Sequence, residues 1–536
     1  MTKQWNEVSQ GLHGAVASLD HRYTQKDVPE LDESMKTLCL IGWRGERVAG
    51  QIVVWSGAEM AQLRASAETI AGAQPTINFI GFVHGSKGAP YNGLYADILD
   101  TATEVQVQAE STQSVWYSLD IPSNAPMGMY KSRVTIRAAG MSPVEIEIEL
   151  EVIAMTLPPA TEWDFHLDLW QHPWAIARTH RVEAFSEEFY AIAKPLYKRL
   201  ADAGQKCLTI PINDRPWNQQ TFDAYATMID WIKQPDGSWC YDYSRFDEYV
   251  AFGEACGIAS QINCYSMVPF KVYKFYYIDG ATGDRLDLVV QPGTKEYADF
   301  WVPFLKDFTR HLRECGRLEK TCIAMDERPI EDLQGVINLV KEHAPELKIV
   351  LAADQNLEAV APDTYDYSFN FCIGEHIDKS VTVPRKELGK KTTFYVCCGP
   401  NRPNTFSFSP PAESVWLNWH AAYKQYDGFL RWAYAHWNED PLATTDWGDG
   451  WPAGDCFLVY PGNRSSIRFE RLREGIQDYE KITRLRTELE KRGKIEELKT
   501  VDEMLAKFNV APDPDQLNQD VNRAKELLHT LSRAID

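Results

Sequence analysis

The chain has 536 residues, of which 44% are hydrophobic, and it carries a formal net charge of −21. This length exceeds that of one ordinary domain, so we expect two domains or a large barrel with additions. Because the negative charge repels a phosphate backbone and no dense run of Lys and Arg opposes it, we expect no nucleic-acid partner.

The cysteines and the N-terminal residues indicate the cellular compartment in which we expect the chain. The 11 cysteines lack zinc spacing, and apart from the adjacent Cys397 and Cys398 most lie in apolar, strand-like runs. This pattern predicts reduced, buried thiols, and we predict no metal and no cofactor. The opening "MTKQWNEVSQ" has no apolar signal segment, and no run reaches membrane-spanning length. We therefore expect a cytoplasmic chain without a membrane span, secretion staying open if a signal was removed. The oligomeric state is not indicated.

The first part of the chain is rich in β-strand patterns. The runs "GMYKSRVTIRAAG" and "VEIEIELEVIAM" alternate polar and apolar residues, which is typical of half-buried antiparallel strands. The segment "TLPPATEW" that follows suits a stiff linker because of its two prolines. We predict a β-sandwich over residues 1–157.

After the linker, short apolar strands alternate with longer helical segments. This order predicts a (β/α)8 barrel over residues 158–464, followed by a charged helical region, 465–536, packed on the barrel. The fold class is therefore multidomain, β plus α/β. The predicted barrel strands are 163–170, 206–212, 259–266, 321–327, 348–354, 366–371, 392–398 and 428–437.

Two adjacent carboxylates, Asp326 and Glu327 (the acid pair), end the fourth predicted strand. Barrel active sites lie at the carboxyl ends of the strands, so the pair is a candidate catalytic site. The alternative is that the pair caps the helix predicted from residue 330, where free amides and the helix dipole favour a negative charge. Since neighbouring strand residues point to opposite faces, the chain must bend here for both side chains to face one pocket.

Further polar and aromatic residues lie at or beyond the other predicted strand ends. Aromatic rings that pack on C–H faces, together with groups that bind hydroxyls, are typical of a sugar site. Taken singly, each Trp is more typical of a core, and His172 equally suits a structural role. The candidate binding residues are Trp170, His172, Tyr395, His436, Trp437, Asn438, Asp446, Trp447, Trp451 and Asp455.

Long blocks of the chain resemble glycoside hydrolase family 123. The blocks are "WRGERVAGQIVVWS" (43–56), "LDLWQHPWAIAR" (167–178), "AMDERP" (324–329), 397–442 and 451–482. The resemblance implies a β-sandwich and a barrel, and an exo-acting, retaining β-N-acetylgalactosaminidase whose substrate is a glycan ending in N-acetylgalactosamine.

The resemblance also implies roles for individual residues. In the implied substrate-assisted mechanism, Glu327 is the general acid and base, and Asp326 holds the acetamido N–H of the sugar. By position, Trp170 or Trp437 is a candidate floor for the sugar ring, and Tyr395 a candidate partner of the acetamido oxygen.

The sequence leaves open two alternative functions and the role of Arg328. The chain could be a non-catalytic carbohydrate-binding protein, or a glycosidase of other specificity with a conventional nucleophile. Candidates for that nucleophile are Asp168, Asp354 and Asp446. Arg328 follows the acid pair directly, and pairing with either carboxylate would lower its pKa and oppose a general acid.

Overall fold

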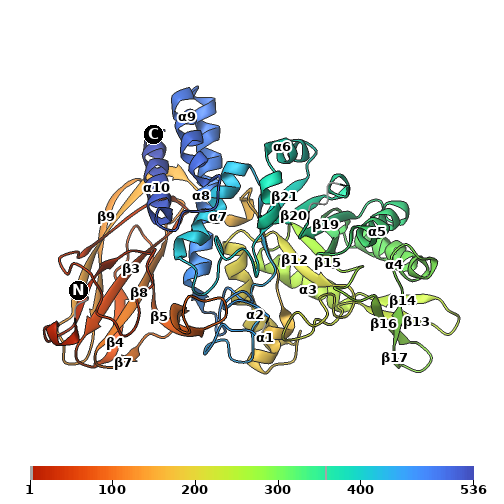
Figure 1. Ribbon diagram of the computed structural model, residues 1–536, viewed down its shortest axis with the longest axis horizontal. Coiled ribbons are helices and arrows are strands. Elements are labelled where there is room, and N and C mark those ends of the chain that lie inside the picture. Colours follow the sequence, from red (N-terminus) through yellow and green to blue (C-terminus); the bar gives the residue numbers. More distant parts are fainter. Residues whose placement is uncertain (1–3, 356–358, 449, 536) are drawn as a thin grey trace. The chain divides into compact units, whose positions relative to one another are not determined.

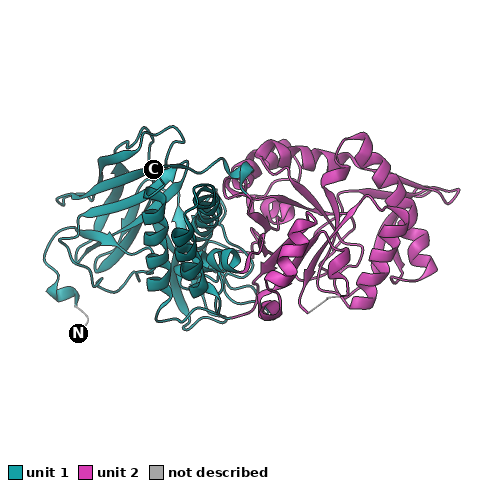
Figure 2. Cartoon of the chain, turned by 90° about the horizontal axis from the view of Figure 1, so that it is seen from above, with its two compact units in different colours: residues 1–163, 401–423, 440–536 teal, residues 164–400, 424–439 magenta. Residues whose placement is uncertain are grey.

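The structure, a computed structural model, describes residues 4–355, 359–448 and 450–535 (Figure 1). It contains two compact units (Figure 2). Unit 1 comprises residues 1–163, 401–423 and 440–536, and unit 2 comprises residues 164–400 and 424–439. The predicted division at residues 157 and 464 stays a prediction, because units defined by contacts need not coincide with domains.

Unit 1 contains two sheets whose apolar faces share one core. In β10, Ile146, Ile148 and Leu150 are buried while Glu145 and Glu147 are exposed, which is the alternation seen in the sequence. One sheet has the order β1 (His13–Ala17), β3 (Arg47–Ser56), β8 (Ser111–Asp120), β5 (Thr76–Gly85), β6 (Gly93–Asp100), β23 (Ser465–Ser466). The other has the order β2 (Thr37–Arg44), β10 (Val144–Thr156), β9 (Gly128–Arg137), β4 (Met60–Ala67), β7 (Val105–Val107).

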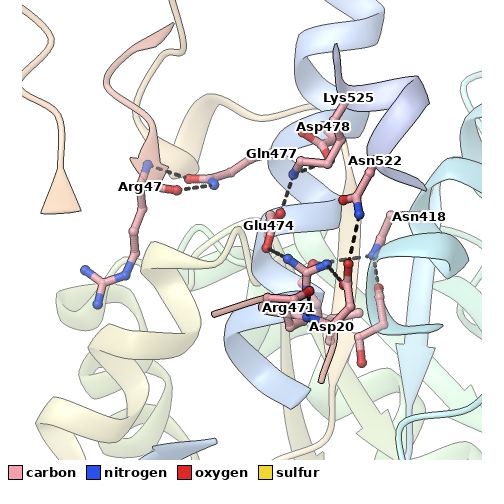
Figure 3. A network of polar contacts seen from close by, with 12 residues as sticks. Asp20, Arg47, Asn418, Arg471, Glu474, Gln477, Asp478, Asn522 and Lys525 are labelled. Atoms are coloured by element: carbon pink, nitrogen blue, oxygen red, sulfur yellow. Dashed lines mark hydrogen bonds and ion pairs between the residues drawn. The ribbon is translucent and has the colours of Figure 1, made fainter. Parts of the chain in front are cut away.

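The C-terminal helices of unit 1 pack on this sandwich through buried polar groups. The Trp43 indole donates to Ser532 of α10 at 3.1 Å. Arg471 of α8 donates to Asp20 at 2.7 Å, and the same polar network continues through neighbouring charges of α8 and α10 (Figure 3). The network lines a cavity of about 260 Å³. The C-terminal helices are α8 (Ile467–Lys491), α9 (Ile495–Leu505) and α10 (Leu517–Arg533), and α7 (Pro411–Lys424) precedes them in the chain.

Unit 2 is a nearly closed parallel barrel, as predicted. The strands at the two ends of the sheet order, β11 and β12, meet where the Lys206 N–H donates to the Leu167 carbonyl at 2.9 Å. The eight predicted strands all occur, and the fourth ends at Met325 rather than at residue 327. The sheet order is β11 (His166–Leu169), β22 (Gly428–Arg431), β21 (Lys391–Tyr395), β20 (Asp366–Asn370), β19 (Lys348–Ala353), β18 (Thr321–Met325), β15 (Gln261–Tyr265), β12 (Cys207–Pro211).

Helices connect the barrel strands, and short 3-10 turns occur in both units. The helices of unit 2 are α1 (Pro173–His180), α2 (Glu187–Asp202), α3 (Ser244–Cys256), α4 (Lys295–Glu314), α5 (Ile330–His343) and α6 (Lys379–Glu387). The 3-10 turns are Trp5–Glu7, Ala160–Glu162, Leu318–Lys320, Ala361–Asp363, Phe371–His376 and Ala506–Phe508.

A second, small sheet of unit 2 was not predicted. Its strands lie in the connections that follow β12 and β15, at the carboxyl ends of these barrel strands. Trp231 of this sheet stacks on Phe300 and Phe304 of α4, with ring centroids 4.7 and 4.3 Å apart. The order is β14 (Trp239–Asp242), β13 (Asp230–Lys233), β16 (Lys274–Asp279), β17 (Arg285–Val289).

Among the described residues, no helix combines the length and the apolar character that crossing a bilayer requires.

Candidate active site

The acid pair lies just beyond strand geometry, between β18 and α5. The strand ends at Met325, and Asp326 Oδ1 accepts the Glu327 N–H at 2.9 Å. This local bend removes the alternation that a continuing strand would impose on the two side chains. The alternative role as a helix cap is not supported, because Pro329 is the N-cap of α5 and no side chain caps it.

Each carboxylate of the acid pair accepts a hydrogen bond from an aromatic side chain of another strand end. The Trp217 indole Nε1 donates to Asp326 Oδ2 at 2.9 Å. The Tyr395 hydroxyl donates to Glu327 Oε1 at 2.5 Å. Trp217 lies in the connection after β12, and Tyr395 is the last residue of β21. Three strand ends of the barrel therefore converge on the acid pair.

The surroundings of the acid pair favour the protonated forms. Burial raises the pKa of Asp326, and the negative charge of Glu327 raises it further, against hydrogen bonds from the Glu327 N–H and Trp217. Burial also raises the pKa of Glu327, while the Tyr395 hydrogen bond lowers it. The pair therefore holds a proton more tightly than ordinary carboxyl groups do.

Aromatic rings pack together beside the acid pair. Trp170 lies 4.9 Å from Trp217 and 4.8 Å from Tyr265, measured between ring centroids. Trp217 in turn lies 4.7 Å from Tyr225. Trp170 is only 2% exposed, and all these rings belong to one apolar cluster that also contains Tyr395. Through this cluster Trp170, a candidate binding residue, contacts Trp217, which donates to Asp326.

The two predicted histidines brace this aromatic cluster. The His172 ring stacks on Tyr225 at 3.8 Å, and its Nε2 lies 3.0 Å from the Asp223 carbonyl. The Tyr225 hydroxyl lies 3.0 Å from His436 Nε2. Burial lowers the pKa of both histidines, so both rings are neutral at neutral pH. Their positions match the structural alternative considered for His172.

Trp437 and Asn438 lie in the segment that follows β22, the eighth barrel strand. Trp437 is fully buried, and its ring lies 5.8 Å from that of His180. Arg178 Nη2 donates to the carbonyl oxygens of Trp437 and Asn438 at 2.8 and 3.0 Å. Trp437 and Trp170 are both buried, and Trp170 is the one that packs on Trp217, the donor of Asp326.

The other predicted binding residues belong to unit 1. There Asp446 accepts hydrogen bonds from the backbone and hydroxyl of Ser86, at 2.9 and 2.7 Å. Trp447 and Trp451 face each other across an isolated antiparallel bridge, and Asp455 is fully buried. The contacts of the acid pair given above all lie within unit 2.

Some side chains of the described residues have the chemistry of metal ligands. Inside the barrel, His166 Nε2 lies 2.9 Å from Asp366 Oδ2 and 3.3 Å from Cys207 Sγ, and all three residues are buried. A second such group, Asp247, His311 and Cys315, is partly exposed. Sequence spacing did not reveal either group. In the group of His166, Cys207 and Asp366, the polar atoms form hydrogen bonds with one another.

Among the candidate nucleophiles, Asp168 is buried in the barrel interior. Its Oδ2 accepts a hydrogen bond from Asn263 at 3.0 Å, and it is 2% exposed. Asp354 is exposed just after β19, and its negative charge raises the pKa of both members of the acid pair. Asp446 is bound within unit 1, so Asp354 is the candidate of unit 2 that solvent reaches.

Sequence reasoning missed Trp217, Tyr225 and Tyr265. A signal existed for Trp217, because it follows the predicted strand 206–212 by a few residues. Tyr265 closes the predicted strand 259–266 and gave no signal beyond its place there. Arg328, considered as a partner of the acid pair, is instead bound to Asp332.

Two family models match the chain. One, described as the glycoside hydrolase 123 catalytic domain, matches residues 170–485. The other, described as the glycoside hydrolase 123 N-terminal domain, matches residues 16–138. The chain is therefore a glycoside hydrolase. It belongs to glycoside hydrolase family 123, which confirms the resemblance noted in the sequence.

One solved structure agrees with this assignment. The chain is similar to a family 123 glycoside hydrolase from Clostridium perfringens, analysed for glycolipid glycan hydrolysis, with 25% identity, 98% of each chain covered and a TM-score of 0.88. A family 39 glycoside hydrolase from Bacteroides cellulosilyticus shows 11% identity, 75% and 77% coverage of this chain and its own, and a TM-score of 0.37, too low to support an argument. No curated protein matches the chain.

Proposed function

We propose that the chain is an exo-acting, retaining β-N-acetylgalactosaminidase that uses the acetamido group of its substrate as the nucleophile. The observation that carries the proposal is the acid pair itself. Asp326 and Glu327 are neighbours in one bend at the barrel's carboxyl end, and each accepts a hydrogen bond from a different aromatic donor. Because the two carboxylates have different hydrogen-bond donors, they can act in different catalytic roles.

Adjacent carboxylates fit the usual glycosidase schemes poorly. Conventional enzymes place two carboxyl groups on opposite sides of the glycosidic bond, about 5 Å apart in retaining and about 6.5–9.5 Å apart in inverting enzymes. Asp326 and Glu327 leave the barrel from one peptide segment, so they approach a bound sugar from the same side. An acetamido oxygen of the sugar supplies the missing nucleophile.

In the first step, Asp326 accepts the acetamido N–H and orients the group. The acetamido carbonyl oxygen attacks the anomeric carbon, and the bond from that carbon to the leaving oxygen breaks. Glu327 gives its proton to the leaving oxygen, so that the aglycone departs as a neutral alcohol. The sugar is left as an oxazolinium ion, whose positive charge the Asp326 carboxylate stabilises.

In the second step, water enters where the aglycone left. Glu327, now a carboxylate, removes a proton from that water as its oxygen bonds to the anomeric carbon. The bond between this carbon and the acetamido oxygen breaks, and the acetamido group is restored. Two inversions at one carbon give net retention of the β-configuration, and Glu327 regains its proton for the next cycle.

The direction of the pKa shift agrees with the role of Glu327, whereas the role of Asp326 needs a further step. Burial raises the pKa of Glu327, which favours the protonated form that a general acid requires. Asp326 has to be ionised when it faces the oxazolinium charge, although burial raises its pKa in the free enzyme. The acetamido N–H and the developing positive charge both favour its carboxylate form, so substrate binding promotes the ionisation that burial opposes.

The substrate class rests on the family and on the aromatic cluster. The relative from Clostridium perfringens was analysed for glycolipid glycan hydrolysis, which supports a glycoconjugate substrate here. Trp217 donates to Asp326 and Trp170 packs on Trp217; both rings are buried, and we assign them to the aromatic layer that supports the sugar site.

Hydrolysis of a matched set of aryl β-glycosides tests the proposal. The set comprises the N-acetylgalactosaminide, N-acetylglucosaminide, galactoside and glucoside, each with wild type and Asp326→Ala. Turnover confined to the N-acetylgalactosaminide, and lost in the variant, is the expected result. Rapid turnover of sugars without an acetamido group would contradict it and would direct attention to Asp354 as a conventional nucleophile. Saturable binding without turnover of any glycoside would favour a carbohydrate-binding protein.

A further inference from the structure

Arg328, the residue directly after Glu327, is held on the side of α5. It is 7% exposed, and its Nη2 lies 3.4 Å from Asp332 Oδ2. Its guanidinium carbon lies 5.4 Å from the ring centroid of Tyr273. The Tyr273 hydroxyl donates to the same Asp332 Oδ2 at 2.6 Å. The three side chains therefore form a closed triangle, the Arg328 anchor.

We propose that Asp332 and Tyr273 are positioning residues that hold the guanidinium of Arg328 away from the acid pair, so that Glu327 keeps the proton of a general acid. The proposal rests on the function proposed above. The side-chain hydrogen bonds given for Asp332 and Tyr273 join them to each other and to Arg328, and not to the acid pair. They act through Arg328.

The sequence makes such an anchor necessary. An arginine next to a general acid places a permanent positive charge within reach of that acid, since its side chain is long and flexible. An opposite charge within about 4–6 Å lowers a carboxyl pKa by about 1–3. A general acid with such a neighbour would lose its proton below neutral pH. The anchor pairs the positive charge of Arg328 with Asp332 and not with Glu327.

The position of Asp332 suits this task. It is buried in the first turn of α5, four residues beyond Arg328, so that the pair closes across the N-cap Pro329. Tyr273 comes from the connection before β16, and it adds a ring face for the guanidinium. The helix and the connection that leads into the inserted sheet thus contribute one group each.

The charged groups around Glu327 agree with this arrangement. Its pKa responds to the Tyr395 hydroxyl of β21, to Asp354 after β19 and to Lys271 in the connection after β15. The cation that lowers it is Lys271. Asp326 is the remaining carboxylate beside it. On the other side, Asp332 and Glu331 of α5 lie near the Tyr273 end of the anchor.

The test compares variants that release Arg328 with one that also removes its charge. In Asp332→Asn, the freed guanidinium is expected to turn to the acid pair. The alkaline limb of the pH profile, set by the proton on Glu327, then shifts to lower pH by about one pH unit or more. In Asp332→Asn with Arg328→Gln, the limb returns toward its wild-type position. The matched control is Glu331→Gln, an exposed neighbour with the same change of charge, which leaves the limb in place.

A second measurement requires no substrate and so separates this proposal from the proposed sugar specificity. Infrared difference spectra follow the carboxyl titration of the free enzyme, and Glu327→Gln identifies the band that belongs to Glu327. We expect this band to titrate at lower pH in Asp332→Asn and near the wild-type pH in the double variant. That pattern would support the anchor even if the aryl glycosides were not hydrolysed.

Two outcomes would overturn the proposal. One is an Asp332→Asn enzyme that folds, as judged by circular dichroism, and titrates as wild type does. The other is a double variant with the same shift as Asp332→Asn, since the effect would then not pass through Arg328. If Asp332→Asn fails to fold, Tyr273→Phe, at a partly exposed residue, replaces it and predicts a smaller shift in the same direction.

Discussion

The indole N–H of Trp217 donates to Asp326 at 2.9 Å, across 109 residues of sequence. The bond joins the connection after β12 to the end of β18 and fixes one carboxylate oxygen of the acid pair. A second aromatic donor, Tyr395, serves Glu327. The two carboxylates therefore have different partners, and substitutions of these partners are expected to move different limbs of the pH profile.

Replacing Trp217 by Phe removes the donor of Asp326 and keeps most of the ring. Because that hydrogen bond favours the carboxylate, its loss raises the pKa of Asp326. Asp326 acts as an anion, so the acidic limb of kcat/KM moves to higher pH, and the rate falls about 10–100-fold, as for the loss of a hydrogen bond to a charged group. Steady-state kinetics over pH measure both effects.

The matched control for Trp217→Phe is Tyr265→Phe. Tyr265 packs in the same aromatic cluster, and its hydroxyl has no hydrogen-bond partner among the described residues. We expect little change in the acidic limb. A shift as large as that of Trp217→Phe would mean that general loosening of the cluster, and not the lost N–H, causes the effect.

Replacing Tyr395 by Phe removes the donor of Glu327. The hydrogen bond lowers the pKa of Glu327, so its loss raises that pKa further. Glu327 acts in its protonated form, and the alkaline limb therefore moves to higher pH, in the direction opposite to Asp332→Asn. The measurement is the pH profile of kcat. An alkaline limb that moves to lower pH would contradict the assigned role of Glu327.

Asp326→Asn is expected to stabilise the fold at high pH. Because burial raises the pKa of Asp326, the folded state binds its proton more tightly than the unfolded chain does. The free energy of unfolding therefore falls as the pH rises from the ordinary aspartate range toward the raised pKa, by about 1.4 kcal/mol for each pH unit between the unfolded and folded pKa values. The amide carries no such charge. Melting temperatures of wild type and variant should agree in acid and diverge as the pH rises from the ordinary aspartate range to the raised pKa of about 8, and curves that stay parallel across that window would count against a raised pKa.

Excess chelator is expected to leave the hydrolytic rate unchanged. The proposed steps use the acid pair and the substrate's acetamido group, and none of them needs a metal ion. The measurement is activity after chelation and dialysis. Loss of activity that a divalent ion restores would contradict the expectation, and the buried group of His166, Cys207 and Asp366 would then be the first to substitute.

Much of the fold could be predicted because it depends on local patterns. The eight barrel strands are short apolar runs between helices, and all occur in the predicted order. The alternation in residues 144–156 likewise identifies β10. The inserted sheet escaped prediction because β13 and β16 pair across a distance in sequence that contains α3 and β15, and because its strands are short.

The candidate site could be predicted only in part, for a related reason. The acid pair stands out as two charges after an apolar strand. Whether a Trp faces a ligand or a core depends on tertiary packing, which the sequence does not contain. Trp437 and Trp170 both follow a strand and both are buried, yet only Trp170 packs on the donor of Asp326. Trp217 and Tyr273 gain their roles only when distant connections meet beside the acid pair.

The substrate's own acetamido oxygen is the nucleophile on which the proposed mechanism depends. The most direct test is the wild-type kcat/KM on aryl β-N-acetylgalactosaminides whose acetyl methyl group carries increasing numbers of fluorine atoms. Fluorine makes the carbonyl oxygen a poorer nucleophile, so kcat/KM is predicted to fall steeply along the series. A rate that does not depend on fluorine, together with a trapped glycosyl-enzyme, would contradict the mechanism and establish a carboxylate nucleophile instead.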